Sequence, residues 1–473
     1  MKNNNLPHNP WMILSVTSIG AFLSTLNSST LNVALPTLMQ DLNAPVTDVG
    51  WVTMSYMVTS TIFVIHAGKL SDLLGRKRIY MAGISILVAT SLLVGFAQSI
   101  FWVILMRILQ GFGAAAMSAN TTAIVADAFP VEKRGTGIGI NGMAFSVGAV
   151  FGPVVGGFLL QFSWHWIFWF NVPLGVLVIL WAWRTLPKET PRTNVHHFDV
   201  AGTLSLLLGL LALLGAITYG LDGALSPVWV FVLFGLSCVS FTIFFKVERK
   251  AEDPIIRMEF FRNRLYAIAN ITTLLNSFAR MSVMFIAIFY LQGVRGFTPL
   301  FSGSIMIAMA ASMAIMGPIS GRLSDRIGSR IPATLGLFLT ALGLLGLTFL
   351  DVNTNIAYIV ICLAIVGIGG GIFQSPNSLA IMNSVPSSYR GVAGGMRMML
   401  MNLGMLLSSS FAAGMLGRAL PSGSMQNNQL TDLQIVPFLS AIHVIFIIGG
   451  IVSLIAVILS WNRESSSKVQ QPL

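Results

Sequence analysis

The fold of this chain is decided by the stretch Gly68-Lys-Leu-Ser-Asp-Leu-Leu-Gly75, which returns as Gly321-Arg-Leu-Ser-Asp-Arg-Ile-Gly328. The two copies share the same Gly, Leu, Ser, Asp and Gly, and each follows a long apolar run. A repeat placed in two short loops between apolar runs indicates a duplicated membrane protein. Eight apolar runs separate the copies, whereas a simple six-plus-six duplication would place six between them.

Composition places the chain in the class of membrane proteins. Hydrophobic residues make up 55% of the 473 residues and charged residues only 9%, whereas a soluble domain carries about 25% charged residues. The apolar runs are about 20 residues long and do not alternate, which indicates helices rather than the strands of a barrel. We therefore expect an all-α polytopic membrane protein.

Fourteen transmembrane helices are predicted from the apolar runs between charged or Pro/Gly-rich breaks. Their expected ranges are 11–38, 48–68, 79–98, 101–126, 136–160, 165–186, 200–220, 228–247, 265–291, 300–320, 331–350, 355–381, 391–415 and 437–461. Most of the 27 Lys and Arg residues fall in alternate loops, and only Arg295 and Arg418 fall in the opposite loops. The positive-inside rule then predicts that both termini are cytoplasmic. It also explains the net charge of +11 as a signal of orientation, so we expect no nucleic-acid partner.

The chain is expected to have three parts. Residues 1–190 form an N-terminal six-helix half, and residues 191–250 form two linking helices. Residues 251–473 form a C-terminal six-helix half with a cytoplasmic tail. A small-molecule site is expected between the halves, near the middle of the bilayer.

Several further motifs accompany the repeat. They are Arg107-Ile-Leu-Gln110-Gly111, Gly148-Ala-Val-Phe-Gly152-Pro153-Val-Val-Gly156-Gly157, Asn32-Val-Ala-Leu-Pro36, Trp164-His-Trp-Ile-Phe-Trp-Phe-Asn171-Val-Pro173 and Phe198-Asp199-Val-Ala-Gly202. Together with the repeat, these motifs resemble the major facilitator superfamily, in particular its fourteen-helix drug:proton antiporter branch.

The resemblance implies a multidrug efflux transporter of the bacterial plasma membrane, with a 6+2+6 arrangement of helices. It implies alternating access, protons and a small drug-like compound as partners, and the proton gradient as energy source. We expect no enzymatic activity, no cofactor, no metal site and a monomer in the bilayer.

The resemblance also implies an inner gate, in which the loop at Gly68 latches the two halves on the cytoplasmic side. The expected gate residues are Gly68, Asp72, Gly75, Arg76, Asp127 and Asp325. Asp72 would face the start of the helix at 391–415, and Arg76 would pair with Asp127. Asp325, in the second copy, has either the same role or a mainly structural one. The alternative for the whole loop is a charged turn that only sets topology.

The glycines at 148, 152, 156 and 157 lie on one helical face. Small residues let helix backbones touch in lipid, and Pro153 adds a weak point. We expect a pliable helix contact at the extracellular gate. Two other glycine strings, Gly135–Gly139 and Gly367–Gly371, lie in or beside predicted helices, which indicates packing rather than nucleotide binding.

Three arginines, Arg107, Arg280 and Arg397, fall inside predicted helices. A charge near mid-bilayer costs at least ~2.5–3.5 kcal/mol, so such residues are candidates for function. The resemblance places Arg107 against the first helix in a proton-coupling role, and the alternative is a structural hydrogen-bond donor. Arg280 either lines the substrate site or is structural. Arg397 is expected to reach the cytoplasmic surface.

The first predicted helix departs from the family pattern. The resemblance implies an aspartate before the Asn32-Val-Ala-Leu-Pro36 string, but Asn27 stands at its place. All 16 acidic residues fall outside the predicted membrane cores, and a carboxamide cannot titrate. His66 is the remaining titratable candidate within a predicted helix, and its alternative role is that of a hydrogen-bonded histidine near the interface.

Three hypotheses follow from Asn27. In the first, the natural chain carries Asp at 27, and Asn27 is an engineered mimic of a protonated carboxyl. In the second, Asn27 is natural, and the protein is an uncoupled exporter of neutral, anionic or lipid-like compounds drawn by Arg107 and Arg280. In the third, the chain is a non-transporting membrane receptor or assembly partner that kept the fold.

The expected substrate cavity is lined by polar and aromatic residues of several helices. They are Asn27, Asn32, Tyr56, Asn141, Asn276, Arg280, Gln374, Asn377 and Asn402. Polar residues in membrane helices often bond only a neighbouring helix, so we expect about half of this set to touch the cavity.

Overall fold

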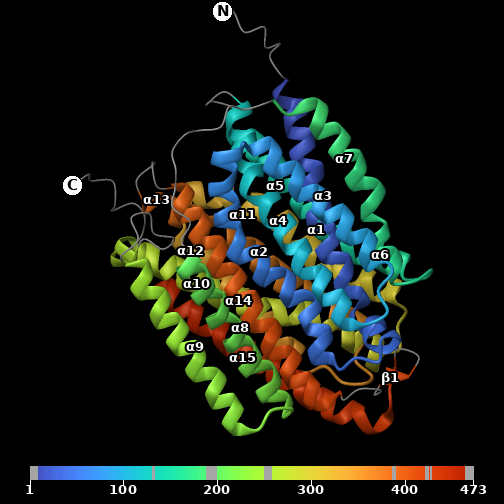
Figure 1. Ribbon diagram of the computed structural model, residues 1–473. Helices are drawn as coiled ribbons and strands as arrows, with labels where there is room; N and C mark the ends of the chain where they lie inside the picture. The colour runs from blue at the N-terminus through green and yellow to red at the C-terminus, as the bar shows by residue number, and fades with distance from the viewer. Residues whose placement is uncertain are drawn as a thin grey trace, which may run out of the picture. The chain divides into compact units, whose positions relative to one another are not determined.

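The computed structural model describes residues 9–129, 134–187, 200–249, 258–385, 390–420, 425–426 and 429–463. Within them, helices occupy each of the fourteen ranges that the apolar runs predict (Figure 1). The long helices are α1 (Pro10–Asp41), α2 (Val46–Leu74), α3 (Arg76–Val94), α4 (Ile100–Ala128), α5 (Arg134–Leu159), α7 (Asn171–Thr185), α8 (Val200–Asp222), α9 (Pro227–Glu248), α10 (Arg264–Phe289), α11 (Pro299–Ile327), α12 (Arg330–Leu347), α13 (Ile356–Asn383), α14 (Arg390–Ala419) and α15 (Asp432–Trp461).

Short elements complete the fold. Helix α6 (His165–Trp169) precedes α7, so the two together fill the predicted range 165–186. A 3-10 helix (Met258–Arg262) precedes α10, and a π-helix (Tyr290–Val294) extends it. Two-residue strands β1 (Met425–Gln426) and β2 (Gln429–Leu430) pair antiparallel before α15.

Twelve helical segments of the described residues are long and apolar enough to cross a membrane. Helices α2 and α5 fall outside this set, although α5 contributes the shorter apolar segment Met143–Leu159. The all-helical character of the chain is confirmed, and the number of helices that cross the bilayer stays a prediction at fourteen.

Contacts divide the chain into two compact units. The first unit contains Met1–Ala34 and Trp51–Thr203, and the second contains Leu35–Gly50 and Leu204–Leu473. Helix α9 and nearly all of α8 therefore group with the second unit. The predicted division at 190 and 250 stays a prediction.

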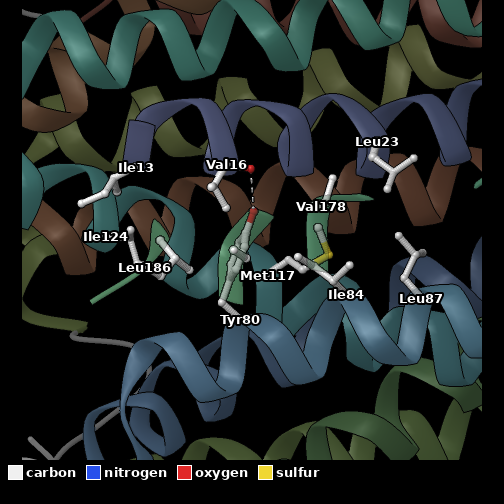
Figure 2. Packing of buried hydrophobic residues seen from close by; sticks show 11 residues of the cluster. Ile13, Val16, Leu23, Tyr80, Ile84, Leu87, Met117, Ile124, Val178 and Leu186 are labelled. Carbon is white, nitrogen blue, oxygen red and sulfur yellow. Dashed lines mark hydrogen bonds between the residues drawn. The ribbon is translucent and has the colours of Figure 1, made fainter. Parts of the chain in front are cut away.

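In the first unit, the hydrophobic core joins α1, α3, α4 and α7 (Figure 2). Tyr80 of α3 lies at its centre, and its hydroxyl donates a hydrogen bond to the Val16 carbonyl oxygen of α1 at 3.2 Å. Leu87 of α3, Met117 of α4 and Val178 of α7 are also buried there. This core fixes α1 and α4, which carry Asn27 and Arg107.

In the second unit, the glycine string of α13 packs against the backbones of α11 and α12. A Cβ at Gly367 would collide with the Met309 carbonyl of α11, and one at Gly371 would lie 2.6 Å from the Met313 carbonyl. A Cβ at Gly369 would lie 2.6 Å from the Gly336 carbonyl of α12. The string therefore lets the backbones of α11 and α12 approach α13 closely, as the packing interpretation predicts.

The sequence repeat is also a repeat of backbone structure. Gly75 has φ 95° between α2 and α3, and Gly328 has φ 80° between α11 and α12. Side chains rarely adopt this conformation, so both positions favour glycine. The Gly75 amide donates to the Ser71 carbonyl and the Gly328 amide to the Ser324 carbonyl, both at 2.9 Å. Each copy therefore builds the same helix-ending turn in its own unit.

Candidate functional site

Asn27 lies in the middle of α1 with 0% of its surface exposed. Its Oδ1 accepts a hydrogen bond from Asn171 Nδ2 of α7 at 3.0 Å, and Asn171 Nδ2 also donates to the Ile167 carbonyl at 3.0 Å. Among the described residues, Asn27 Nδ2 has no partner. The amide therefore serves as an acceptor for α7, and a carboxyl oxygen would accept the same bond.

Arg107 is fully buried on α4, and its polar contacts are with α2 and its own helix. Its Nε donates to the Val52 carbonyl at 3.1 Å, and its Nη1 donates to Gln110 Oε1 at 2.8 Å. The guanidinium carbon lies 4.1 Å from the centre of the Tyr56 ring, within the range of a cation–π interaction. The resemblance placed Arg107 against the first helix. Among the described residues, its connection to α1 runs through Tyr56, whose hydroxyl is 3.4 Å from Ser24 Oγ, and its role in proton coupling stays a prediction.

The remainder of that motif serves the same contact. Gln110 Nε2 donates to Ser91 Oγ of α3 at 3.0 Å. A Cβ at Gly111 would lie 2.8 Å from the Tyr56 carbonyl, so glycine lets α4 approach α2 closely. The motif holds α2, α3 and α4 together around one buried guanidinium.

The glycines of α5 pack against α1 within the first unit. A Cβ at Gly148 would lie 2.7 Å from the Phe22 carbonyl, and one at Gly156 would lie 2.6 Å from the Thr30 carbonyl. Gly152 faces Ser29, whose hydroxyl donates to the Ala149 carbonyl at 3.0 Å. Pro153 and Gly157 are buried in the same helix. This face brackets the turn of α1 that carries Asn27.

The predicted inner gate is described only in part. The side chains of Asp72, Asp127 and Asp325 lie outside the described residues, so the latch and the pairing of Arg76 with Asp127 stay predictions. Gly68 lies within α2, and Arg76 is half-buried at the first position of α3.

Lys77, the next basic residue, ties the gate region to α7. Its Nζ donates to the carbonyl oxygens of Trp183 at 2.7 Å and Leu186 at 2.5 Å. Carbonyls at the C-terminal end of a helix carry partial negative charge, so a cation there is stabilising. The start of α3 and the end of α7 are thereby joined.

His66, the remaining titratable candidate, is buried near the end of α2, and both of its ring nitrogens have partners. Its Nδ1 lies 3.1 Å from the Ile62 carbonyl, and its Nε2 lies 2.5 Å from Thr203 Oγ1 at the start of α8. This environment suits a hydrogen-bonded structural histidine.

Arg280 lies on α10 of the second unit, and Asn276 lies one turn before it. Within the described part of the chain, the Arg280 guanidinium has one hydrogen-bond acceptor, the Met313 sulfur of α11, 2.6 Å from Nη1. Among the described residues, Arg280 Nε and Asn276 Oδ1 have no partner. Asn276 is 4% exposed, so a polar pair with spare hydrogen-bonding capacity lies inside the C-terminal half.

Asn377 of α13 is part of a packing network. Its Nδ2 donates to the Ala269 carbonyl and to Thr273 Oγ1 of α10, both at 2.9 Å. Its Oδ1 accepts from Arg463 Nη1 at 3.1 Å, and Arg463 also donates to the Ser329 carbonyl. Arg463 is 1% exposed, so this residue of the predicted tail is buried beyond the end of α15.

The other predicted cavity residues are dispersed over both units. Asn32 of α1 is buried, and Asn141 of α5 is half-buried with an unpartnered Nδ2 among the described residues. Gln374 of α13 and Asn402 of α14 are half-buried in the second unit. Arg397 of α14 is also half-buried, with Nη2 4.0 Å from the Met398 sulfur.

An apolar cavity of about 520 Å³ lies in the second unit, among α8, α9, α10 and α14. Its lining residues are Ala216, Ile217, Gly220, Leu221, Val230, Phe234, Phe278, Leu407 and Phe411. None of the predicted cavity residues lines it. Among the described residues, no cluster of His, Cys, Asp and Glu could hold a metal ion.

Four contributors were not predicted from the sequence: Asn171, Gln110, Met313 and Arg463. Asn171 and Gln110 belong to motifs given above, and a polar residue inside a predicted membrane helix indicates a buried hydrogen bond, so their polarity could have identified them. Met313 is one of 24 methionines, and Arg463 follows the last apolar run like an ordinary tail residue. Neither carries a sequence signal of its contact.

Comparison with known proteins identifies the family. The model of the Major Facilitator Superfamily matches residues 17–409 and 269–472. The chain belongs to this superfamily. It is therefore a transporter and not an enzyme, a polytopic membrane protein, and its partner is a small-molecule substrate.

Two curated relatives of this major facilitator resemble it over most of its length. The riboflavin transporter RibZ of Clostridioides difficile is 31% identical over 415 residues, which cover 87% of this chain and 89% of RibZ. The multidrug transporter protein MdtP of Bacillus subtilis is 32% identical over 426 residues, which cover 90% of this chain and 77% of MdtP.

Solved structures share the fold at low identity. A bacterial homolog of the human lysosomal transporter Spinster superimposes with a TM-score of 0.69, at 15% identity, and covers 97% of each chain. At this identity the likeness supports the fold alone. The fold of the described helices is that of a major facilitator.

Proposed function

We propose that this major facilitator exports small, largely apolar or drug-like compounds across the bacterial plasma membrane by alternating access. The observation that carries the proposal is the packing of the α5 glycine face on α1 around Asn27. That face matches the motif typical of antiporters, and the relatives MdtP and RibZ are named for multidrug and riboflavin transport. The proposed chain is a monomer of the fourteen-helix branch, with both termini cytoplasmic.

Position 27 is the proposed coupling point. The Asn171 amide already donates to Asn27 Oδ1, so a carboxyl at 27 would keep this bond. It would also replace the Asn27 Nδ2 donor, which is buried and unpartnered among the described residues. A protonated carboxyl has one acceptor oxygen and one O–H donor, so the Asn27 amide reproduces its hydrogen-bonding groups. The local structure thus supports an aspartate at 27 in a proton-coupled form of the protein, with Asn27 mimicking the protonated state.

The second candidate is an uncoupled exporter with Asn27 as the natural residue. The Asn27–Asn171 amide pair favours it, because this pair joins α1 to α7 without a titratable group. In that case the buried cations Arg107 and Arg280 would select for neutral or anionic cargo.

One experiment separates the candidates. Efflux of a fluorescent dye is measured from proteoliposomes with the Asn27 chain and with Asn27→Asp, each with and without an imposed pH gradient. We expect the rate of dye efflux by the Asn27 chain to be the same with and without the pH gradient. The rate for Asn27→Asp should rise several-fold when the gradient is imposed, because only the carboxyl can carry a proton. Identical responses of the two chains would exclude position 27 as the coupling point. Absence of flux from both would contradict the exporter function.

A further inference from the structure

Arg280 occupies an unusual electrostatic position in the second unit. It lies within the segment Arg264–Val294, which is long and apolar enough to span the membrane. A buried cation in such a segment is expected to have a counter-charge or several carbonyl acceptors. Among the described residues, the guanidinium instead contacts the Met313 sulfur, and its Nε is buried without a partner.

Two other arginines, Arg107 and Arg463, differ from Arg280 in having oxygen acceptors, although Arg107 Nη2 and Arg463 Nε are likewise buried without a partner among the described residues. Arg107 bonds a backbone carbonyl and Gln110 and lies over the Tyr56 ring. Arg463 bonds a backbone carbonyl and Asn377. Their oxygen acceptors account for their positions in the fold. Among the residues that the structure describes, Arg280 has the thioether sulfur of Met313 as its acceptor, and a thioether is a weak acceptor.

The fold nevertheless keeps a space for this guanidinium. A Cβ at Gly370 of α13 would lie 2.7 Å from Arg280 Nη1 and 3.2 Å from its Cδ. Glycine at 370 therefore leaves room for the side chain between α10, α11 and α13. The neighbouring Gly371 and Gly367 serve a different contact, with the α11 backbone.

Asn276 adds a second unsatisfied group on the same face of α10. Residues four apart lie one above the other on a helix, so Asn276 and Arg280 project from the same face of α10. Asn276 Oδ1 is buried and unpartnered among the described residues. A carboxamide can present either its carbonyl or its NH2 to a ligand. The pair can thus bind an oxyanion and an adjacent polar atom.

We propose that Arg280 and Asn276 form a subsite for the carboxylate of an organic acid that this protein transports. The proposal rests on the proposed export function and names its substrate class. A guanidinium matches a carboxylate in charge and in the geometry of its donors. The same guanidinium repels cations, so the subsite selects acids over amines and esters of the same shape.

The test uses dansylglycine and its methyl ester, which differ in charge at one carboxyl group. Binding of each dye to the purified full-length chain is measured by dansyl fluorescence. We expect the acid to bind at least about tenfold more tightly than the ester, as one charge-assisted hydrogen bond provides. Arg280→Gln should abolish the preference, and Arg280→Lys should keep part of it.

Two further variants separate a ligand contact from a folding effect. Gly370→Ala leaves the charge in place but moves the guanidinium, so it should weaken acid binding and leave ester binding unchanged. Arg418→Gln removes an exposed arginine of α14 in the same unit and should keep the full preference for the acid. Ester binding by every variant reports that the fold is intact.

Equal affinity for acid and ester, no binding of the acid, or an unchanged preference in Arg280→Gln would each overturn the proposal. Export from proteoliposomes is measured separately. A chain that binds the acid through Arg280 but does not move it would contradict the export function and leave the subsite standing. Export of both dyes with equal affinity would leave the export function standing and remove the subsite.

Discussion

The two units of this transporter surround an arginine of a membrane helix in different ways. In the first unit, Arg107 is 0% exposed, bonds two oxygen acceptors and lies over an aromatic ring. In the second unit, Arg280 is partly exposed, its guanidinium contacts the Met313 sulfur, and Gly370 of α13 leaves space for its side chain. In the first arrangement the cation joins helices through oxygen acceptors, with only Nη2 unpartnered, whereas in the second no oxygen acceptor is found among the described residues. Two cations in one fold thus have different roles, set by their neighbours rather than by burial alone.

The largest expected difference is between the losses of stability caused by adding a methyl group at a glycine of each unit. In the first unit, Gly156→Ala places a Cβ 2.6 Å from the Thr30 backbone carbonyl, and a backbone cannot move aside easily. We expect a loss of about 1–3 kcal/mol of stability from overpacking. In the second unit, Gly370→Ala meets the mobile end of Arg280 and should cost far less. Thermal denaturation of both variants in detergent checks this order, and the reverse order would contradict the assigned contacts.

The next expected difference is between the losses of stability caused by replacing Arg107 and Arg280 with methionine. Arg107→Met leaves the Gln110 carbonyl oxygen without its donor in a buried site, at a cost of about 1–3 kcal/mol. Arg280→Met removes a charge that has no oxygen acceptor in the described structure, and replacement of a buried charge by an apolar side chain is often neutral or stabilising. The apparent Tm of Arg107→Met should be the lower of the two. Equal losses would show that Arg280 is as structural as Arg107.

The smallest expected effect tests the ring over Arg107. Tyr56→Phe keeps the ring and loses only the long contact with Ser24 Oγ, so its stability should change by less than about 0.5 kcal/mol. Tyr56→Leu removes the cation–π interaction, which contributes about 0.5–2 kcal/mol. Thermal denaturation compares the two variants. A Phe variant as unstable as the Leu variant would assign the role to the hydroxyl instead of the ring.

The sequence predicted the helices and their turns well, because their signals are local. Apolar runs located each of the fourteen long helices. The repeat was expected in loops, but its residues continue α2 and α11 as far as Leu74 and Ile327, and the chain turns only at the last glycine of each copy, Gly75 and Gly328. The spacing of Gly148 and Gly156 likewise places them on one face. Helices, turns and the glycine face each depend on residues that are close together in the chain, so they can be predicted from a single sequence.

The partners of buried polar groups could not be predicted in this way. Nothing near Asn27 indicates that it bonds Asn171, since 144 positions separate them. Asn377 was predicted to line a cavity, and it bonds α10 and Arg463. A polar residue in a membrane helix needs a partner, but its identity depends on how the helices pack.

The most direct test of the contrast between the two arginines is the stabilisation produced by a carboxylate ligand. Thermal denaturation is followed with and without saturating dansylglycine for the wild-type chain and for Arg280→Met. Binding to the native state at 100 times Kd adds about 2.7 kcal/mol, and binding at 10 times Kd adds about 1.4 kcal/mol. The wild-type Tm should therefore rise by several degrees, and the Arg280→Met Tm should rise by about half as much or less, because this variant is expected to bind the acid at least about tenfold more weakly. An equal rise in both chains, or none in the wild type, would contradict the assignment of Arg280 to the ligand.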